Sequence, residues 1–180
     1  MFTAQQRRQM LDLAVTSIEA ALRTGARPAP GELPDYLQAW GASFVTLRRR
    51  GELIGCIGAL EAYQPLGRDI VTHAVAAAFD DPRFPPIDTL DGVHVEISVL
   101  GELIPFAADS YLDVVRRLPR AGAVVEARGR RGTFLPAVWE QLPVAEDFVA
   151  GLWRKAGLPA RTWPVAVWTY DVEEFGTDVG

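Results

Sequence analysis

The most unusual chemical feature of the sequence is the segment Gly55-Cys56-Ile57-Gly58. Glycine on both sides of a cysteine removes side-chain bulk from a strand, so that a ligand or a neighbouring chain segment can approach the backbone closely. Cys56 is the only cysteine, and as a thiol it could be a nucleophile if a base, a cation or a helix N-terminus activates it. The alternative is a packing role, because unpaired cysteine is usually buried.

Apolar and polar side chains alternate over residues 93–99, which predicts a β-strand over residues 93–100. Ile97 and Val99 should then be buried, whereas His94, Glu96 and Ser98 should share the opposite face. Glu96 and Ser98 are candidate acid–base or hydrogen-bonding groups for Cys56, which we expect to lie close to them. For His94 we favour the simpler interpretation that it lies on the solvent face of a half-buried strand.

A proline-rich loop at residues 81–86 carries one acid and one base. Arg83 could bind a substrate carboxylate or phosphate through its guanidinium group. Alternatively, Asp81 caps a turn and Arg83 pairs with a nearby acid. We include Asp81 and Arg83, together with Gly55 and Gly58, as candidate binding residues because loops often carry function.

Motifs for nucleotide binding, serine hydrolysis and zinc proteolysis are absent, so no cofactor is predicted. The possible metal ligands Cys56, His73 and His94 fall on separate predicted elements. They are a poor basis for a closed zinc or iron site, and we predict no stoichiometric metal.

The patterns that must position these residues predict an α+β fold with a largely antiparallel sheet packed against helices. A capping box at Thr3 and Gln6 begins a helix that Gly25 ends, with Leu11, Val15, Ile18 and Leu22 on its apolar face. The other predicted helices cover residues 35–40, 65–79, 110–118 and 145–156. The predicted strands are 43–48 and 53–57, 93–100, a hairpin at 123–135, and a last strand at 165–172.

The bulk composition is that of one globular domain covering residues 1–180. The chain is 49% hydrophobic and 23% charged, with a net charge of −5. No apolar run is long enough to span a membrane and the N-terminal residues do not resemble a signal peptide, so we expect a soluble, cytoplasmic protein. The acidic balance disfavours general binding of nucleic acid.

Two arginine clusters, at residues 48–50 and 128–131, leave a local RNA contact open. Both clusters fall where hairpin turns are predicted, however, and we favour the interpretation that they are exposed turn residues.

Six segments in a fixed order resemble the AMMECR domain family, known in prokaryotes as the A protein of the AmmeMemoRadiSam system. These segments are residues 44–47, 53–60, 77–86, 96–100, 134–140 and 155–163. The resemblance implies one larger and one smaller subdomain, with sheet and helices forming a groove. It also implies association with a Memo-like protein and a radical-SAM protein, but it implies no particular reaction.

The chain departs from the family pattern in two places. Ile54 stands where the family has an arginine directly before the Gly-Cys-Ile-Gly motif, and Ala137 follows Pro136 where glutamine is usual. Our leading hypothesis is an accessory or enzyme component of that system with a groove site around Cys56. A non-catalytic binding or scaffold protein, which Ile54 favours, and an RNA-binding accessory are the alternatives.

Overall fold

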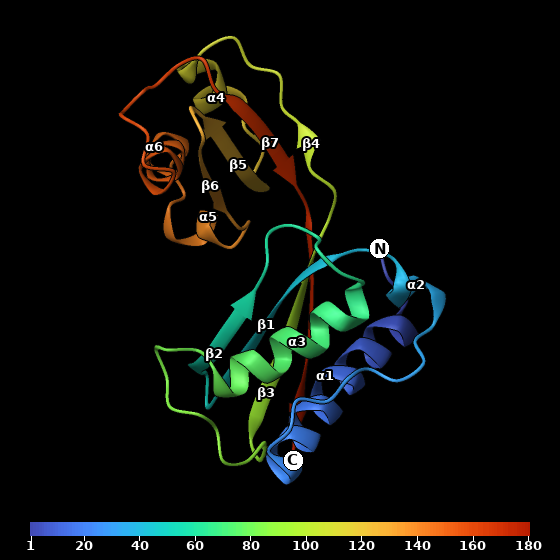
Figure 1. Ribbon diagram of the computed structural model, residues 1–180. Coiled ribbons are helices and arrows are strands. Elements are labelled where there is room, and N and C mark those ends of the chain that lie inside the picture. The colour runs from blue at the N-terminus through green and yellow to red at the C-terminus, as the bar shows by residue number, and fades with distance from the viewer. The chain divides into compact units, whose positions relative to one another are not determined.

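The computed structural model describes residues 1–180 and divides them into two compact units (Figure 1). Unit 1 comprises residues 1–100 and 173–180, and unit 2 comprises residues 101–172. The chain therefore leaves unit 1 once and returns to it for its last strand. Each unit has its own sheet and its own hydrophobic core, which confirms the α+β class and a larger and a smaller subdomain.

Unit 1 has a four-stranded sheet with two long helices on one face (Figure 1). The strand order is β2-β1-β3-β8. Its elements are α1 (Ala4–Thr24), α2 (Asp35–Gln38), β1 (Ala42–Arg49), β2 (Glu52–Gly58), α3 (Leu66–Phe79), β3 (Val93–Leu100) and β8 (Val172–Val179). Both α1 and α3 contact the sheet and each other, so they bury its apolar face.

Unit 2 has a second four-stranded sheet, in the order β4-β7-β5-β6. Its elements are β4 (Ile104–Pro105), α4 (Tyr111–Arg117), β5 (Gly122–Ala127), β6 (Arg130–Phe134), α5 (Val138–Gln141), α6 (Ala145–Lys155) and β7 (Ala166–Tyr170). Its core includes the stacked rings of Trp139 and Phe148, whose centroids are 3.8 Å apart. Unit 2 thus depends on aromatic packing, whereas the core of unit 1 is mainly aliphatic.

The major elements lie where the sequence predicts them, but three features differ. The strands form two sheets rather than one, and the short elements β4 and α5 were not predicted. The predicted last strand, 165–172, corresponds to β7, whereas the further strand β8, which reaches Val179 in the other sheet, was not predicted. β8 is an edge strand in which acidic and glycine residues alternate with partly buried ones, a weak signal for a strand.

Helix α1 begins and ends as the sequence predicts. Thr3 and Gln6 form a reciprocal capping box, and Gly25 adopts a left-handed conformation with φ of 69°. The fully buried stripe differs from the predicted one, because Met10 and Ala14 have no exposed surface, whereas Val15 and Leu22 are partly exposed. The small alanine permits close packing at the centre of the stripe, and the bulkier predicted residues lie at its margin.

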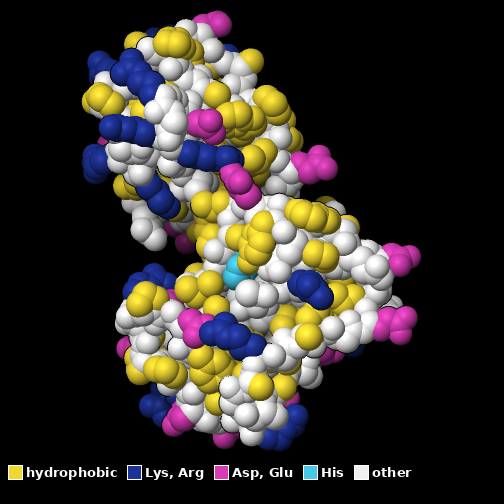
Figure 2. All heavy atoms as spheres, viewed as in Figure 1, with side chains coloured by type: hydrophobic (Ala, Val, Ile, Leu, Met, Phe, Trp, Pro, Cys, Tyr) yellow, Lys and Arg dark blue, Asp and Glu magenta, His cyan; other side chains and the backbone are white.

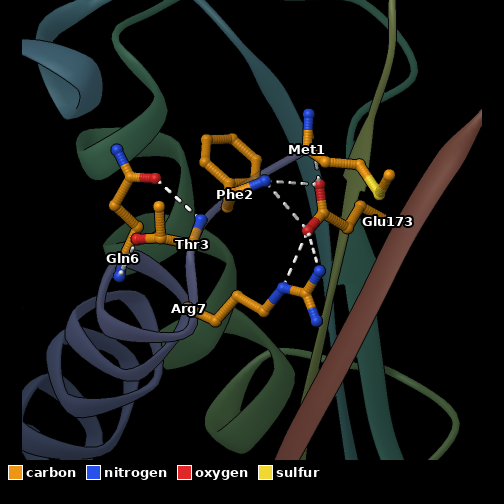
Figure 3. Close-up of polar contacts among 6 residues, drawn as sticks. All are labelled: Met1, Phe2, Thr3, Gln6, Arg7 and Glu173. Carbon is orange, nitrogen blue, oxygen red and sulfur yellow. Dashed lines mark hydrogen bonds and ion pairs between the residues drawn. The ribbon is translucent and has the colours of Figure 1, made fainter.

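The N-terminus of α1 is attached to β8 by one carboxylate (Figure 3). Glu173 accepts hydrogen bonds from the Phe2 amide at 3.0 and 3.1 Å and from Arg7 Nε at 2.8 Å. The same side chain forms an ion pair with the Arg7 Nη2 at 2.8 Å. Because Glu173 is the first residue to return from unit 2, this contact joins the beginning of unit 1 to its end.

Both arginine clusters lie at hairpin turns. In the β1–β2 turn, Arg50 and Gly51 have φ of 54° and 82°, and in the β5–β6 turn, Arg128 and Gly129 have φ of 53° and 70°. Two consecutive residues with positive φ define a type I′ turn, which matches the twist of the strands that it joins. The clusters are therefore hairpin tips.

The charge is divided unevenly between the units. Residues 101–172 hold nine basic and eight acidic side chains, whereas the rest of the chain holds nine and fifteen. Figure 2 shows basic side chains gathered along one side of unit 2. No helix in the structure is both long enough and apolar enough to cross a membrane.

The burial of β3 generates the first prediction. Ile97 has no exposed surface, as its alternation predicts, and Ile97→Ala should lower the free energy of unfolding by about 2–5 kcal/mol because it leaves a cavity. The matched control is Ile104→Ala in β4, where the residue is 59% exposed and the loss should be below about 0.5 kcal/mol. Denaturant unfolding measures both, and equal losses would contradict the assigned core.

Candidate functional site

The register of the unit 1 sheet places Cys56, Thr46 and Glu96 in a single row. Thr46 of β1 pairs with Cys56 of β2 on one side and with Glu96 of β3 on the other. Directly paired residues of antiparallel strands project on the same face. The adjacent row, in which Val45 pairs with Ile57 and Ile97, packs into the core under the helices. The candidate residues therefore project from the sheet face opposite α1 and α3.

Thr46 lies between the thiol and the carboxylate. Its hydroxyl donates a hydrogen bond to Cys56 Sγ at 3.3 Å. Cys56 and Glu96 are separated by two strand spacings, about 10 Å, so they share a surface without touching. Thr46 was not among the predicted site residues, although it lies within the predicted strand at 43–48.

Ser98 belongs to the next row, in which Phe44 pairs with both Ser98 and Gly58. The Ser98 hydroxyl donates to Glu174 Oε1 of β8 at 3.4 Å. Sequence reasoning also missed Glu174, because β8 was not predicted to join this sheet. Ser98 is therefore directed toward β8, on the side of β3 away from Cys56.

Asp81 and Arg83 hold the outer edge of β2 at Cys56. Asp81 Oδ2 accepts a hydrogen bond from the Cys56 amide at 2.9 Å, and Arg83 Nη2 donates to the Cys56 carbonyl at 3.1 Å. β2 is an edge strand, and these bonds satisfy backbone groups that no neighbouring strand can reach. The predicted loop and the predicted cysteine are thus in direct contact, through the backbone of Cys56.

The two side chains of this loop also bind each other. Arg83 donates from Nε to Asp81 Oδ1 at 2.9 Å and from Nη2 to Asp81 Oδ2 at 2.8 Å. The Arg83 guanidinium holds the pKa of Asp81 well below its usual range, and the Cys56 and Arg83 amides act in the same direction. Asp81 is therefore a fixed anion near neutral pH and is unsuited to proton transfer.

Arg83 remains a cation with a partly exposed head group. Its hydrogen bond to Asp81 raises its pKa, and the charges of Asp81 and Cys56 act in the same direction. The side chain is 57% exposed, and Nη1 makes none of the bonds described above. The exposed part of this guanidinium retains the charge and the donor that an anion-binding role needs.

The two glycines around Cys56 make room for neighbouring parts of the chain. A Cβ at Gly55 would collide with the backbone carbonyl of Ala77 in α3, and a Cβ at Gly58 would collide with the ring of Phe44. Both glycines therefore permit the close approach of a neighbouring part of the chain rather than of a ligand. Neither glycine leaves an open space for a ligand.

The β1–β2 register skips Ile54. Leu47 pairs with Gly55 and Arg48 with Leu53, so Ile54 is the extra residue of a β-bulge. Its side chain packs against the core of unit 1. Bulges redirect side chains locally, and here the position that carries arginine in the family pattern carries an apolar side chain that contributes to packing.

The two histidines, which are the other potential metal ligands, contact other side chains. His94 Nδ1 contacts Asp178 Oδ1 of β8 at 2.8 Å, on a partly exposed part of the sheet. His73 lies in α3 beside Asp69 and Tyr63. No three histidine, cysteine or acidic side chains come together in a way that could hold a metal ion.

Comparison with known proteins gives one consistent family. The sequence profile of the AMMECR1 family matches residues 11–175, and the chain belongs to this family. A protein of Methanothermobacter thermautotrophicus is 37% identical over 162 residues, which cover 84% of this chain and 82% of the relative. A protein of Thermotoga maritima is 34% identical over 169 residues, covering 90% and 94%.

A solved structure shows the same fold. The uncharacterized protein PH0010 from Pyrococcus horikoshii superimposes with a TM-score of 0.83 at 30% identity. The match covers 97% of this chain and 93% of the solved chain. The resemblance inferred from six short segments is therefore confirmed over nearly the whole length.

The glycine packing generates a prediction about stability. Gly55→Ala should reduce the free energy of unfolding by about 1–3 kcal/mol or more, because the added methyl group meets backbone that cannot rotate away. Gly31→Ala is the control, since a Cβ at that position would meet nothing within 4 Å. A Gly55→Ala variant as stable as the Gly31→Ala variant in denaturant unfolding would contradict this close approach.

The Asp81–Arg83 pair generates a prediction about pH. Asp81→Asn should lower the stability at pH 7 by about 1–3 kcal/mol, because the bonds to Cys56 and Arg83 lose their charged acceptor. The folded-state pKa of Asp81 is depressed, so its contribution is complete above the unfolded value of about 4. The difference between wild type and variant should persist down to that pH and shrink below it. A difference that grows on acidification would refute the assignment.

Proposed function

We propose that this AMMECR1-family protein is the enzyme component of a three-protein system with a Memo-like and a radical-SAM protein, and that Cys56 is its reactive thiol. The observation that supports this site is that Asp81 binds the backbone amide of Cys56 and Arg83 binds its backbone carbonyl. A thiol on a backbone held in this way has a defined position, which covalent chemistry requires. The two partners are suggested by the family resemblance.

The groups around Cys56 have complementary roles in this proposal. Arg83 binds an anionic group of the substrate beside Cys56, whose backbone carbonyl it already contacts. Glu96, farther along the same sheet face, acts on another part of the same ligand as an acid–base or hydrogen-bonding group, whereas Ser98 is buried and binds Glu174 of β8. The spacing of about 10 Å between Cys56 and Glu96 suits a ligand that spans β1 rather than a direct thiol–carboxylate pair.

A non-catalytic binding protein is the second candidate. Its support is that Gly55, Gly58 and Ile54 all serve packing, so most of the motif can be explained without chemistry. An RNA-binding accessory is a third candidate that rests on the arginine clusters. It requires that binding weaken as salt increases, and filter binding across a salt series with no such response would eliminate it.

Thiol labelling separates a reactive Cys56 from a packing residue. In the native protein we expect iodoacetamide to label Cys56 rapidly, without prior unfolding. Arg83→Gln should slow the reaction near neutral pH, because it removes the neighbouring cation. The control is Arg131→Gln, which changes an arginine in unit 2. Labelling that occurs only after unfolding would refute the proposal.

Reconstitution with the two purified partner proteins separates enzyme from scaffold. If Cys56→Ser abolishes turnover by the mixture while the proteins still assemble, Cys56 has a chemical role. If neither turnover nor assembly depends on Cys56 or Arg83, the site is wrong. Assembly that is lost together with turnover in both variants would instead favour the binding protein.

A further inference from the structure

A second constellation of polar groups lies at the start of α3, away from the contacts of Cys56. Asp69 is completely buried, and its Oδ2 accepts hydrogen bonds from the Ser43 amide and hydroxyl, each at 2.7 Å. His73, one helical turn later, places Nδ1 3.1 Å from the same oxygen. On the other side of its ring, His73 Nε2 is 3.2 Å from the hydroxyl of Tyr63. The three groups form a chain from a buried carboxylate to the hydroxyl of a half-exposed tyrosine.

The carboxylate decides how the histidine is protonated. Two acceptors 3.1 Å apart would repel each other, so Nδ1 carries a proton and faces Asp69 Oδ2. This contact is electrostatic, because the N–H direction departs from hydrogen-bonding geometry. In neutral His73, Nε2 is then the acceptor, and Tyr63 donates its hydroxyl proton to it.

Burial and the Asp69 charge raise the pKa of Tyr63, so its hydroxyl keeps its proton in the resting state. A nucleophile in this condition needs a base that removes the proton during attack. Tyr63 is 51% exposed, whereas His73 is nine-tenths buried behind it. Part of the tyrosine is thus accessible from the surface, whereas the base is covered.

We propose that Tyr63 is a nucleophile that accepts an acyl group from an activated acyl donor, with His73 as its general base and Asp69 as the residue that positions His73. This arrangement has the hydroxyl, base and orienting acid that activated nucleophiles share. The negative charge of Asp69 acts on Tyr63 and disfavours an incoming phosphoryl group, whereas a neutral carbonyl carbon meets no such repulsion.

The transfer balances without any further reagent. Tyr63 Oη attacks the carbonyl carbon of the donor and forms a C–O bond as its proton passes to His73 Nε2. The bond between the carbonyl carbon and the leaving group then breaks. His73 returns the proton to the leaving group, leaving an acyl-tyrosine ester and neutral imidazole.

Acylation with N-acetylimidazole, followed site by site with mass spectrometry, tests the proposal. Tyr36 is the internal reference, because its hydroxyl donates to the Gln9 side-chain oxygen at 2.7 Å and meets no imidazole. His73→Gln keeps a polar side chain but removes the base. We expect it to slow acetylation of Tyr63 at least about tenfold while the Tyr36 rate is unchanged. In wild type, acetylation of Tyr63 should also be slower in D₂O than in H₂O by a larger factor than that of Tyr36.

The opposite outcomes have distinct meanings. If His73 serves only to hold the segment before α3, its loss frees Tyr63 and the acetylation rate stays the same or increases, which overturns the proposal. Equal isotope effects at Tyr63 and Tyr36 overturn it as well, and this comparison needs no variant. A His73→Gln protein that fails to fold therefore still leaves a decisive measurement.

Discussion

The direct packing of the α3 backbone against β2 at Gly55 is the constraint on which the arrangement around Cys56 depends. The Ala77 carbonyl occupies the space that a side chain at Gly55 would need. One residue along β2 and four along the chain from Ala77, the Asp81 carboxylate reaches the Cys56 amide. Any side chain at Gly55 would move the end of α3 away from the strand and with it the acid. The glycine beside the cysteine therefore sets the position of the loop that fixes the cysteine.

Two buried aspartates give α3 the same connection at both ends. Asp69, in its first turn, accepts a bond from the Ser43 amide at the start of β1, and Asp81, just after its last turn, accepts one from the Cys56 amide of β2. Each carboxylate accepts a hydrogen bond from a strand N–H and also contacts a polar side chain. Asp69 lies beside His73, which in turn contacts the half-exposed Tyr63, and Asp81 binds Arg83 directly. Because buried carboxylates must be paired, both ends of the helix collect polar groups, and the two proposed reactive groups lie beside these ends.

The sheet of unit 1 keeps apolar and polar rows apart through its register. Val45, Ile57 and Ile97 form a row under the helices, and Thr46, Cys56 and Glu96 form a row on the other face. A slip of one residue would exchange these rows, so burial of the apolar row also fixes the polar one. The bulge at Ile54 ends this regular pairing and directs its side chain to the core. The site thus extends along β1 rather than gathering around the thiol alone.

Local sequence patterns determined the elements of this protein, because capping residues, alternation and turn chemistry act over a few residues. The Thr3 capping box, the strand at Val93–Leu100 and the two arginine-containing hairpins all follow from such patterns. Tertiary structure alone decided that the strands form two sheets, that β8 returns to the first, and that Thr46 separates Cys56 from Glu96. Only contact between distant segments brings Asp81 to Cys56 and Asp69 to Ser43, because the energy of such contacts depends on packing that no short window of sequence contains.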